Sequence, residues 1–268
     1  MKILFICTGN TCRSPMAEGY MKSMGFDCES RGLAADGSKV SNNSAEAMKE
    51  IDIDITDHIS KQLTKSDIDN FDTIICMSKN HFDYLTSLGI KCEVLGDGIS
   101  DPFGGDIDVY RNCRDEIIRA LYKRFGRVVY MDDSHIDGVV DIENYSFSHP
   151  WTKEGIIEAK NNRTKFYVFE KSGEVLGYVG ISVILDEGYI TNIAVLPKYR
   201  GNGIGKALMK KLDDLARLEK LSFISLEVRV SNQNAISLYE KFGYKTEGVR
   251  KGFYDDPKED ALIMTKRF

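Results

Sequence analysis

Two hydrophobic patterns follow one another along the chain. Within the first 126 residues, Lys2–Cys7 and Thr73–Met77 each contain a continuous apolar run, which is typical of strands buried on both faces of a sheet. Ser14–Met24, Asn80–Leu88 and Ile107–Phe125 instead carry apolar side chains at helical spacing. Strands that alternate with helices predict a parallel sheet covered on both faces.

The pattern changes after Gly126. A strand is expected over Arg127–Met131, and three more strand-like runs lie between Phe166 and Val195. The further expected elements are turns at Ser172–Gly173 and Glu187–Gly188, a helix over Gly203–Leu218, a strand over Ser222–Val228, a helix over Asn234–Phe242 and two last strands. Several antiparallel strands before a helix indicate an α+β arrangement. We therefore expect two domains, residues 1–126 and 127–268.

Composition excludes some classes of protein. The 268 residues include 36 Lys and Arg against 41 Asp and Glu, a formal net charge of −5, which gives no overall basic surface for direct binding of nucleic acid. The N-terminal apolar run is too short for a signal peptide, and no segment approaches the roughly 20 apolar residues that span a bilayer. We expect a soluble, cytoplasmic protein that has no membrane partner.

All six cysteines lie in the first half, at positions 7, 12, 28, 76, 92 and 113. Their spacing fits no zinc-ligand pattern, so we expect no metal. The last four are expected to be small buried side chains. Cys7 and Cys12 lie in a loop where a thiolate is useful. Cys12 could form a disulfide with Cys7 under peroxide, or it could be a buried thiol that faces the sheet; both alternatives stay open.

A candidate phosphate-binding loop joins the first strand to the first helix. Backbone N–H groups at such a helix start can point at one anion, and Gly9 permits the backbone angles that this arrangement needs. Arg13 would close the loop with a guanidinium fork suited to phosphate oxygens, and its charge would favour the Cys7 thiolate. Ser14 is placed to hydrogen-bond that thiolate, and Asn10 can hold the loop through its amide. The expected phosphate-binding residues are Thr8, Gly9, Asn10, Thr11, Cys12, Arg13 and Ser14.

The string Cys-Thr-Gly-Asn-Thr-Cys-Arg-Ser-Pro-Met-Ala-Glu that begins at Cys7, with the later Asp-Pro-Phe-Gly-Gly that begins at Asp101, resembles the low-molecular-weight protein tyrosine phosphatase family. The resemblance covers roughly residues 1–126 and implies an α/β domain with a flavodoxin-like parallel sheet. It implies that Cys7 is the nucleophile of a phosphocysteine intermediate, that Arg13 binds phosphate, and that Asp101 gives a proton to the leaving group.

Two subgroups of this family compete with the tyrosine phosphatase reading. Arsenate reductases need two further cysteines close together. Here Cys76 and Cys92 are 16 positions apart and Asp101 is a hydrolase feature, so the sequence does not favour a reductase. Protein arginine phosphatases carry Thr where tyrosine phosphatases usually carry a bulky aliphatic residue, and Thr11 matches them. A hydroxyl there could orient a guanidinium, although Thr11 could also be a neutral loop variant.

A second candidate site lies at the start of the helix expected from Gly203. The preceding glycine-rich turn offers backbone N–H groups and a helix dipole that can hold a pyrophosphate, although such a motif can also be a plain helix start. Its flanking segments resemble the GCN5-related N-acetyltransferases (GNAT), and most closely the ribosomal-protein-alanine N-acetyltransferases, over about residues 127–268. The segments are Glu187–Val195, Leu226–Ile236, Leu238–Tyr244, Phe147–Thr152 and Glu259–Met264.

This second resemblance implies acetyl-CoA as the acetyl donor. It implies that Glu227 deprotonates an α-ammonium group through water and that Tyr239 protonates the leaving CoA thiolate; an α-amine is protonated near neutral pH, so a base is useful. Tyr239 could instead be a core tyrosine, and Glu227 a solvated carboxylate. The implied acetyl-CoA ligands are Ile193, Ala194 and Val195 for the thioester and pantetheine, Gly201, Asn202, Gly203, Ile204, Gly205 and Lys206 for the pyrophosphate, and Asn232 for the pantetheine.

Together these resemblances predict a bifunctional enzyme. Its partners would be a phosphorylated protein, as phosphoarginine or phosphotyrosine, and the N-terminal alanine of small-subunit ribosomal protein number eighteen. Two alternatives stay open: one domain is only a targeting or binding module, or the acetyltransferase acts on a small-molecule amine.

Overall fold

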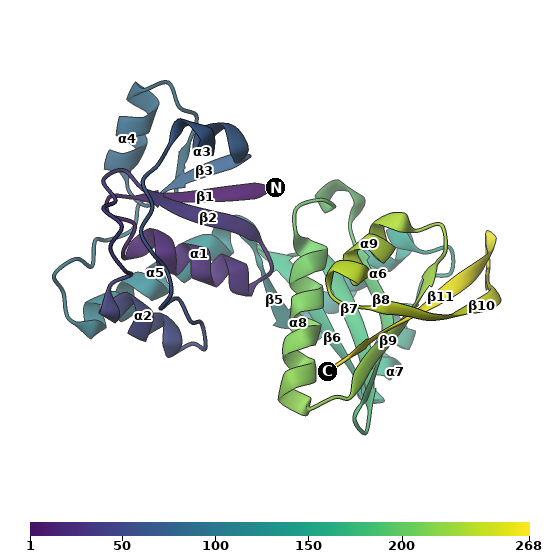
Figure 1. Ribbon diagram of the computed structural model, residues 1–268. Helices are drawn as coiled ribbons and strands as arrows, with labels where there is room; N and C mark the ends of the chain where they lie inside the picture. The colour runs from purple at the N-terminus through teal and green to yellow at the C-terminus, as the bar shows by residue number, and fades with distance from the viewer. The chain divides into compact units, whose positions relative to one another are not determined.

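The structure is a computed structural model that describes residues 1–268. The chain divides into two compact units, Met1–Gly126 and Arg127–Phe268, and each contains one sheet (Figure 1). None of its helices combines the length and the apolar character needed to cross a membrane.

The first unit is built on a four-stranded sheet with the order β2-β1-β3-β4, in which all neighbouring strands are parallel. The predicted parallel α/β arrangement is therefore confirmed. Its elements are β1 (Lys2–Cys7), α1 (Arg13–Ser23), β2 (Asp27–Gly32), α2 (Asn42–Lys49), α3 (Lys65–Asn70), β3 (Thr73–Cys76), α4 (Lys79–Ser87), β4 (Glu93–Val94) and α5 (Ile107–Phe125).

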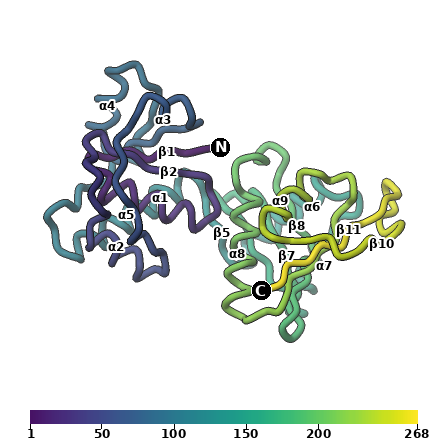
Figure 2. The backbone as a smooth tube through the Cα atoms, in the orientation of Figure 1, coloured from purple at the N-terminus to yellow at the C-terminus, as the bar shows by residue number.

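Helices cover both faces of this sheet. Leu4 and Ile6 of β1 pack with Leu85 of α4 in one buried cluster. On the other face, α1, α2 and α5 pack together (Figure 1). Because the strands are parallel, β1 and β3 both end at the sheet edge opposite the N-terminus mark, where their loops gather (Figure 2). These loops provide the first candidate site.

The second unit holds a seven-stranded sheet with the order β10-β11-β9-β8-β7-β6-β5. All neighbours are antiparallel except β8 and β9, so the predicted α+β arrangement is confirmed. Its elements are β5 (Arg127–Tyr130), α6 (Ile136–Ser146), α7 (Lys153–Asn161), β6 (Thr164–Lys171), β7 (Glu174–Ile184), β8 (Glu187–Val195), α8 (Ile204–Glu219), β9 (Phe223–Arg229), α9 (Gln233–Lys241), β10 (Lys245–Asp255) and β11 (Lys258–Arg267).

One of the two expected turns lies elsewhere. Ser172 and Gly173 both have positive φ, 52° and 83°, as a two-residue hairpin turn requires, so this prediction is confirmed. The prediction of a turn at Glu187–Gly188 is wrong, because both residues belong to β8. The turn precedes them, at Leu185, which has φ 56°. Gly188 is needed for close packing instead: a Cβ there would lie 2.9 Å from Ile224 Cγ1.

The neighbouring strands β8 and β9 of the second sheet separate along their length. β8 and β9 pair only where Glu187–Tyr189 lies beside Phe223–Ser225. Beyond this point β8 stays paired with β7 as far as Val195, and β9 stays paired with β11 as far as Arg229. The edge of β8 that faces β9 therefore has unpaired backbone groups from Ile190 onward, which can accept an extended ligand.

Candidate active sites

The loop after β1 surrounds a cysteine thiol with hydrogen-bond partners. Sγ of Cys7 lies 3.0 Å from Oγ of Ser14, and the Asn10 backbone N–H donates to Sγ at 3.2 Å. Cys7 itself is only 3% exposed. A thiolate at this position would be stabilised by both donors, which favours a nucleophilic role.

Four backbone N–H groups of the same loop, those of Thr8, Gly9, Thr11 and Cys12, donate to no acceptor within the protein. They lie between β1 and the N-terminus of α1, where the helix dipole favours negative charge. Unpaired N–H groups in such a place need an acceptor, and an oxyanion such as phosphate can bind several of them. The loop therefore has the chemistry of a phosphate site.

The loop's left-handed residue is Asn10. Gly9 was expected to supply the unusual backbone angles, and that expectation is wrong: Asn10 has φ 55°, whereas the φ of Gly9 is not positive. Asn10 is fully buried, and its amide Nδ2 donates to Ser14 Oγ at 3.0 Å and to Ser30 Oγ at 2.7 Å. Its Oδ1 accepts from the Lys61 backbone N–H at 2.9 Å. These bonds hold Asn10 in a conformation that asparagine tolerates better than most residues.

Arg13 and Asp101 come together although 88 positions separate them. The NH2 group of Arg13 donates a hydrogen bond to Asp101 Oδ2 at 2.7 Å, and its NH1 group donates one to the Ile99 carbonyl at 3.2 Å. The Arg13 side chain is 7% exposed and that of Asp101 is 56% exposed. The structure thus places a buried cation at the loop and an accessible carboxyl group beside it.

The six cysteines are all buried free thiols. The prediction that the last four are small buried side chains is confirmed, and burial raises the pKa of Cys28 and of Cys113 to about 12. One alternative placed the Cys12 thiol against the sheet, and this alternative is wrong. Cys12 packs against Ala47 and Tyr110 on α2 and α5, and its Sγ lies 3.5 Å from the Tyr110 hydroxyl. The Cys7–Cys12 disulfide stays a prediction.

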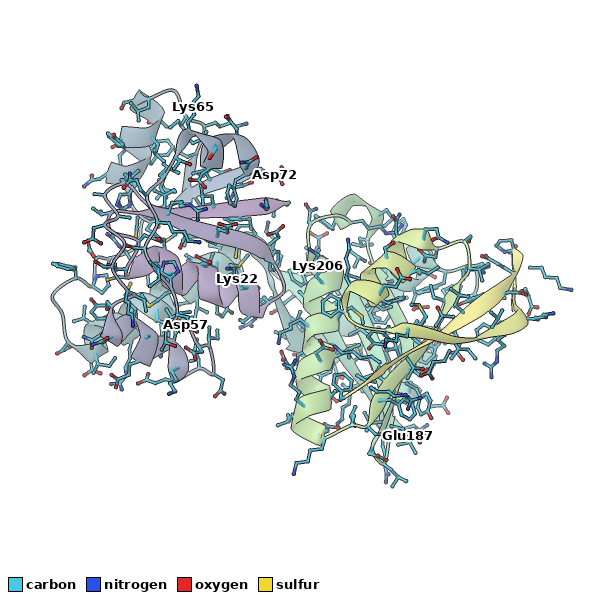
Figure 3. The ribbon with its side chains drawn as sticks, in the orientation of Figure 1. Lys22, Asp57, Lys65, Asp72, Glu187 and Lys206 are labelled. Carbon is cyan, nitrogen blue, oxygen red and sulfur yellow. The ribbon has the colours of Figure 1, made fainter.

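In the second unit, the glycine-rich turn before α8 leaves its backbone N–H groups free. Gly201 and Gly203 have positive φ, 79° and 87°, and no side chain caps the helix. The first N–H groups of a helix have no partner inside it. Lys206 lies on the first turn of α8 (Figure 3). A pyrophosphate fits this combination of unpaired N–H groups and a nearby cation.

Side chains hold this turn against the end of β8. Arg200 Nε donates to the Val195 carbonyl at 3.0 Å, and Asn202 Nδ2 donates to the Tyr199 carbonyl at 3.2 Å. A Cβ on Gly205 would lie 3.2 Å from Leu238 Cδ2, so its lack of a side chain permits the close approach of α9. The glycine-rich turn is therefore fixed next to the end of β8, which carries Ile193, Ala194 and Val195, the residues expected to hold the thioester end.

Glu227 and Tyr239 have different surroundings. Glu227 lies on β9, its side chain is 35% exposed, and Oε1 accepts from Arg250 NH1 at 3.0 Å. Tyr239 lies on α9 and is 5% exposed; burial, and then the nearby Tyr254, raise its pKa above the usual range. A tyrosine whose pKa is raised keeps its proton at neutral pH, so it can donate that proton to a leaving group.

Asn232 is the N-cap of α9. Its Oδ1 accepts from the Ala235 backbone N–H at 3.2 Å. This bond gives Asn232 a structural task besides the proposed binding of pantetheine, because an N-cap contributes about 1 kcal/mol to helix stability.

Comparisons with known proteins agree with this geometry. The family model of the low molecular weight phosphotyrosine protein phosphatase matches residues 2–132, and that of the acetyltransferase (GNAT) family matches residues 133–244. The protein-arginine-phosphatase of Geobacillus stearothermophilus is 40% identical over 131 residues, which cover 43% of this chain and 88% of that protein. The ribosomal protein bS18-alanine N-acetyltransferase of Escherichia coli is 31% identical over 136 residues, 50% of this chain and 92% of that protein. The crystal structure of the Escherichia coli ribosomal-protein-S18-alanine N-acetyltransferase matches with a TM-score of 0.50 and 29% identity, over 53% of this chain and 93% of that one.

The chain belongs to both families. It joins a low-molecular-weight phosphatase unit to a GNAT unit, and both are families of enzymes.

In the phosphatase unit, the structure adds support for the loop from residues outside its motif, His58 among them. His58 Nε2 lies 3.1 Å from the Asn10 carbonyl and 3.2 Å from Asn10 Oδ1. Glu18 accepts from Ser30 Oγ at 2.5 Å, and Ser30 in turn accepts from Asn10. Burial lowers the pKa of His58, while Glu18 acts in the opposite direction. Two cavities of about 390 and 650 Å³ border Glu18 and His58, so they adjoin this support rather than the Cys7 thiol.

In the GNAT unit, sequence reasoning missed Tyr254 and Glu143. The Tyr254 hydroxyl donates to the Glu227 carbonyl at 3.4 Å, and the Arg229 guanidinium lies 4.1 Å from its ring centre. Glu143 is fully buried, accepts from the Tyr178 hydroxyl, and accepts from Asn192 Nδ2 at 2.7 Å. Burial raises the pKa of Glu143. No local sequence pattern marks either residue, because Tyr178 and Asn192 for Glu143, and Glu227 for Tyr254, lie on strands far along the chain.

Proposed function

We propose that the first unit is a cysteine-dependent protein phosphatase that acts on phosphoarginine. The observation that carries this proposal is the set of unpaired amides around the Cys7 thiol, closed by the pair of Arg13 and Asp101. The amides and Arg13 would hold the phosphate oxygens, as oxyanion-binding groups do in other phosphoryl-transfer sites.

The groups of this site allow two successive displacements at phosphorus. The Cys7 thiolate attacks phosphorus, the bond from phosphorus to the leaving nitrogen or oxygen breaks, and the Asp101 carboxylic acid gives its proton to that leaving atom. Asp101, now ionised, takes a proton from water as the water oxygen attacks the phosphocysteine. This second step breaks the S–P bond, releases phosphate and restores the thiolate.

Two observations support phosphoarginine as the substrate. Thr11 contributes a hydroxyl to the loop. This hydroxyl lies beside Gly9, since its Oγ1 would be 3.5 Å from a Cβ placed there. A relative that is 40% identical bears the name protein-arginine-phosphatase. The test is a panel of phosphoarginine and phosphotyrosine peptides with the whole chain. A wide preference for phosphotyrosine would overturn the substrate and leave the family unchanged.

The covalent mechanism has its own test. Cys7→Ser is nearly isosteric but supplies a far poorer nucleophile, so it should abolish phosphate release while acetyl transfer by the same sample is unchanged. Appreciable hydrolysis by this variant would contradict the mechanism. Loss of both activities would indicate misfolding, and Cys113→Ser, at a buried thiol outside the loop, serves as the matched control.

We propose in addition that the second unit transfers acetyl from acetyl-CoA to the N-terminal alanine of a ribosomal protein, and that the chain works in the cytoplasm. The unpaired edge of β8 and the uncapped start of α8 fit the pantetheine and the pyrophosphate respectively. Glu227 would remove a proton from the α-ammonium through water, and the nitrogen would then attack the thioester carbon. Tyr239 would give its proton to the CoA sulfur as the C–S bond breaks.

The acetyl acceptor can be identified by mass spectrometry. A peptide with the N-terminus of small-subunit ribosomal protein number eighteen should gain one acetyl group on its α-amine when incubated with acetyl-CoA and the chain. Acetylation of an internal lysine with the α-amine left free would overturn this assignment, and so would acetylation of small amines alone.

A further inference from the structure

His81 contacts the phosphate loop from a helix that carries no part of the loop motif. It is the third residue of α4 and is only 5% exposed. Its Nε2 lies 2.9 Å from Oγ1 of Thr8, the residue that follows the nucleophile, and its Nδ1 lies 2.8 Å from Oγ of Ser78. Ser78 is itself the N-cap of α4 and accepts from the His81 backbone N–H.

The surroundings of His81 keep its ring neutral. Burial first, and then the Arg13 charge, lower the pKa of His81 to about 4, while Asp101 acts in the opposite direction. A neutral imidazole donates from one ring nitrogen and accepts at the other. Hydroxyl groups can do either, so Thr8 and Ser78 satisfy both nitrogens whichever tautomer is present.

The loop is thus held from two sides. On one side, Asn10 is fixed by Ser30 and by the Lys61 backbone N–H. On the other side, Thr8 is fixed by His81, while its carbonyl accepts from the Ala34 N–H at 2.9 Å. In both supports a residue of the loop motif is held by residues outside the motif.

The helix that carries His81 is also joined to the segment that carries the proton donor. The Ile99 N–H donates to the Met77 carbonyl at 2.7 Å, just before α4 begins, and Ile99 in turn accepts from Arg13. His81 therefore lies where the phosphate loop meets the segment that leads to Asp101.

We propose that His81 is a positioning residue of the phosphatase reaction, which holds the Thr8 side chain and so fixes the unpaired loop amides around the substrate phosphate. This inference rests on the proposed phosphatase function. Donors that are fixed in advance stabilise the charge that develops in the transition state, whereas donors that must first be ordered do so less well. Loss of the contact should therefore lower kcat more than it weakens binding of phosphate.

Two substitutions of His81 by amide residues distinguish its contact to Thr8 from its contact to Ser78. Glutamine can place its terminal amide near the position of Nε2, so His81→Gln keeps a partner for Thr8. Asparagine is shorter and reaches only the position of Nδ1, so His81→Asn keeps the contact to Ser78 and loses the contact to Thr8. Ser78→Ala is the matched control, because it removes the second partner and leaves Thr8 bound.

We expect His81→Asn to lower kcat for para-nitrophenyl phosphate by about 10–100-fold, since a misplacement of about 1 Å can cost about 100-fold in rate. The inhibition constant of inorganic phosphate should change less than about threefold. His81→Gln and Ser78→Ala should stay within about threefold of the wild-type kcat. Urea unfolding of each variant separates this effect from loss of the fold.

A double-mutant cycle with Thr8→Val decides whether the effect passes through Thr8. If it does, His81→Asn should lower kcat little further when Thr8 is already Val. If the losses of kcat in the two single variants multiply in the double variant, the inference is overturned. It is also overturned if His81→Asn keeps the wild-type kcat, or if its loss of kcat is accounted for by a loss of stability in urea. A wild-type chain that releases no phosphate from any phosphate ester or phosphoarginine peptide would overturn the proposed function and this inference with it.

Discussion

Arg13 donates a hydrogen bond to Asp101 at 2.7 Å, so the expected phosphate binder and the expected proton donor are joined directly. The guanidinium is nearly buried, and a second bond to the Ile99 carbonyl fixes its direction. An incoming phosphate dianion would compete with Asp101 for the same guanidinium. The carboxyl group would then be released close to the bond that breaks, which is where a general acid must act.

This pairing gives the first prediction. Asp101→Asn should keep phosphate binding, or strengthen it, because the competing carboxylate is removed from Arg13. It should slow the first chemical step about 10²–10⁴-fold for poor leaving groups, which need a proton, and far less for activated aryl phosphates. The measurement is kcat against leaving-group pKa for a series of aryl phosphates. An equal loss across the series would contradict a role as proton donor.

Thr11 should determine the substrate class. Thr11→Ile replaces a hydroxyl by an aliphatic side chain, so it should favour a phenol ring over a polar guanidinium. We expect the ratio of kcat/KM for phosphoarginine over phosphotyrosine peptides to fall by at least about tenfold and the preference to reverse. Thr11→Ser keeps the hydroxyl and is the control. An unchanged ratio in Thr11→Ile would show that specificity arises elsewhere in the site.

Gly32 should be necessary for the phosphate loop. A Cβ at Gly32 would lie 2.7 Å from the Thr8 carbonyl oxygen and 3.1 Å from Asn10 Cβ, so Gly32→Ala must displace the loop. We expect loss of phosphatase activity and a stability loss of about 1–3 kcal/mol. Gly155→Ala is the control, because a Cβ there would meet only Thr152 Oγ1 at 3.5 Å. It should not lower the free energy of unfolding. Acetyl transfer should survive both changes.

The candidate sites were predicted where their chemistry is local in sequence. Cys7, Arg13 and Ser14 lie within eight positions, and the strand before them is a continuous apolar run. His81 and Tyr254 could not be found in this way, because their contacts join elements far apart in the chain. The spacing from Ser78 to His81 is a helix-capping spacing, and that was the one available signal.

The elements of the fold were likewise predicted where the pattern of a single segment reveals them. β2 was missed because it is an edge strand whose side chains alternate between buried and less buried, so it contains no continuous apolar run. The left-handed position of the loop was assigned to Gly9 instead of Asn10, because glycine is the usual left-handed residue. The partners that hold Asn10 come from β2 and the loop at Lys61, which the loop motif does not reveal. The separation of β8 from β9 depends on pairing with β7 and β11, which no single segment reveals.

The stability of the phosphatase unit should fall as pH falls. The pKa of His81 is lowered to about 4, and the pKa of His58 is lowered as well, both mainly by burial. Below about pH 6.5 the unfolded chain therefore binds protons that the folded unit does not, and the free energy of unfolding decreases from there toward pH 4. Hydrogen exchange of the β1 amides is the measurement, because the single Trp lies in the other unit. His81→Gln should make the dependence shallower; an unchanged slope would contradict the neutral state of His81.

Acetyl transfer should depend on Glu227 and Tyr239 in different ways. Glu227→Gln removes the base, so its rate should fall most at low pH, where the acceptor amine is protonated, and approach the wild-type rate as pH rises. Tyr239→Phe removes only the hydroxyl from a buried ring, so kcat should fall while the KM for acetyl-CoA changes little. Glu247→Gln, at an exposed carboxylate that pairs with Arg267 much as Glu227 pairs with Arg250, is the control for loss of a surface ion pair. If Glu227→Gln and Glu247→Gln gave the same pH profile, Glu227 would be a solvated strand residue and the base would have to be another group.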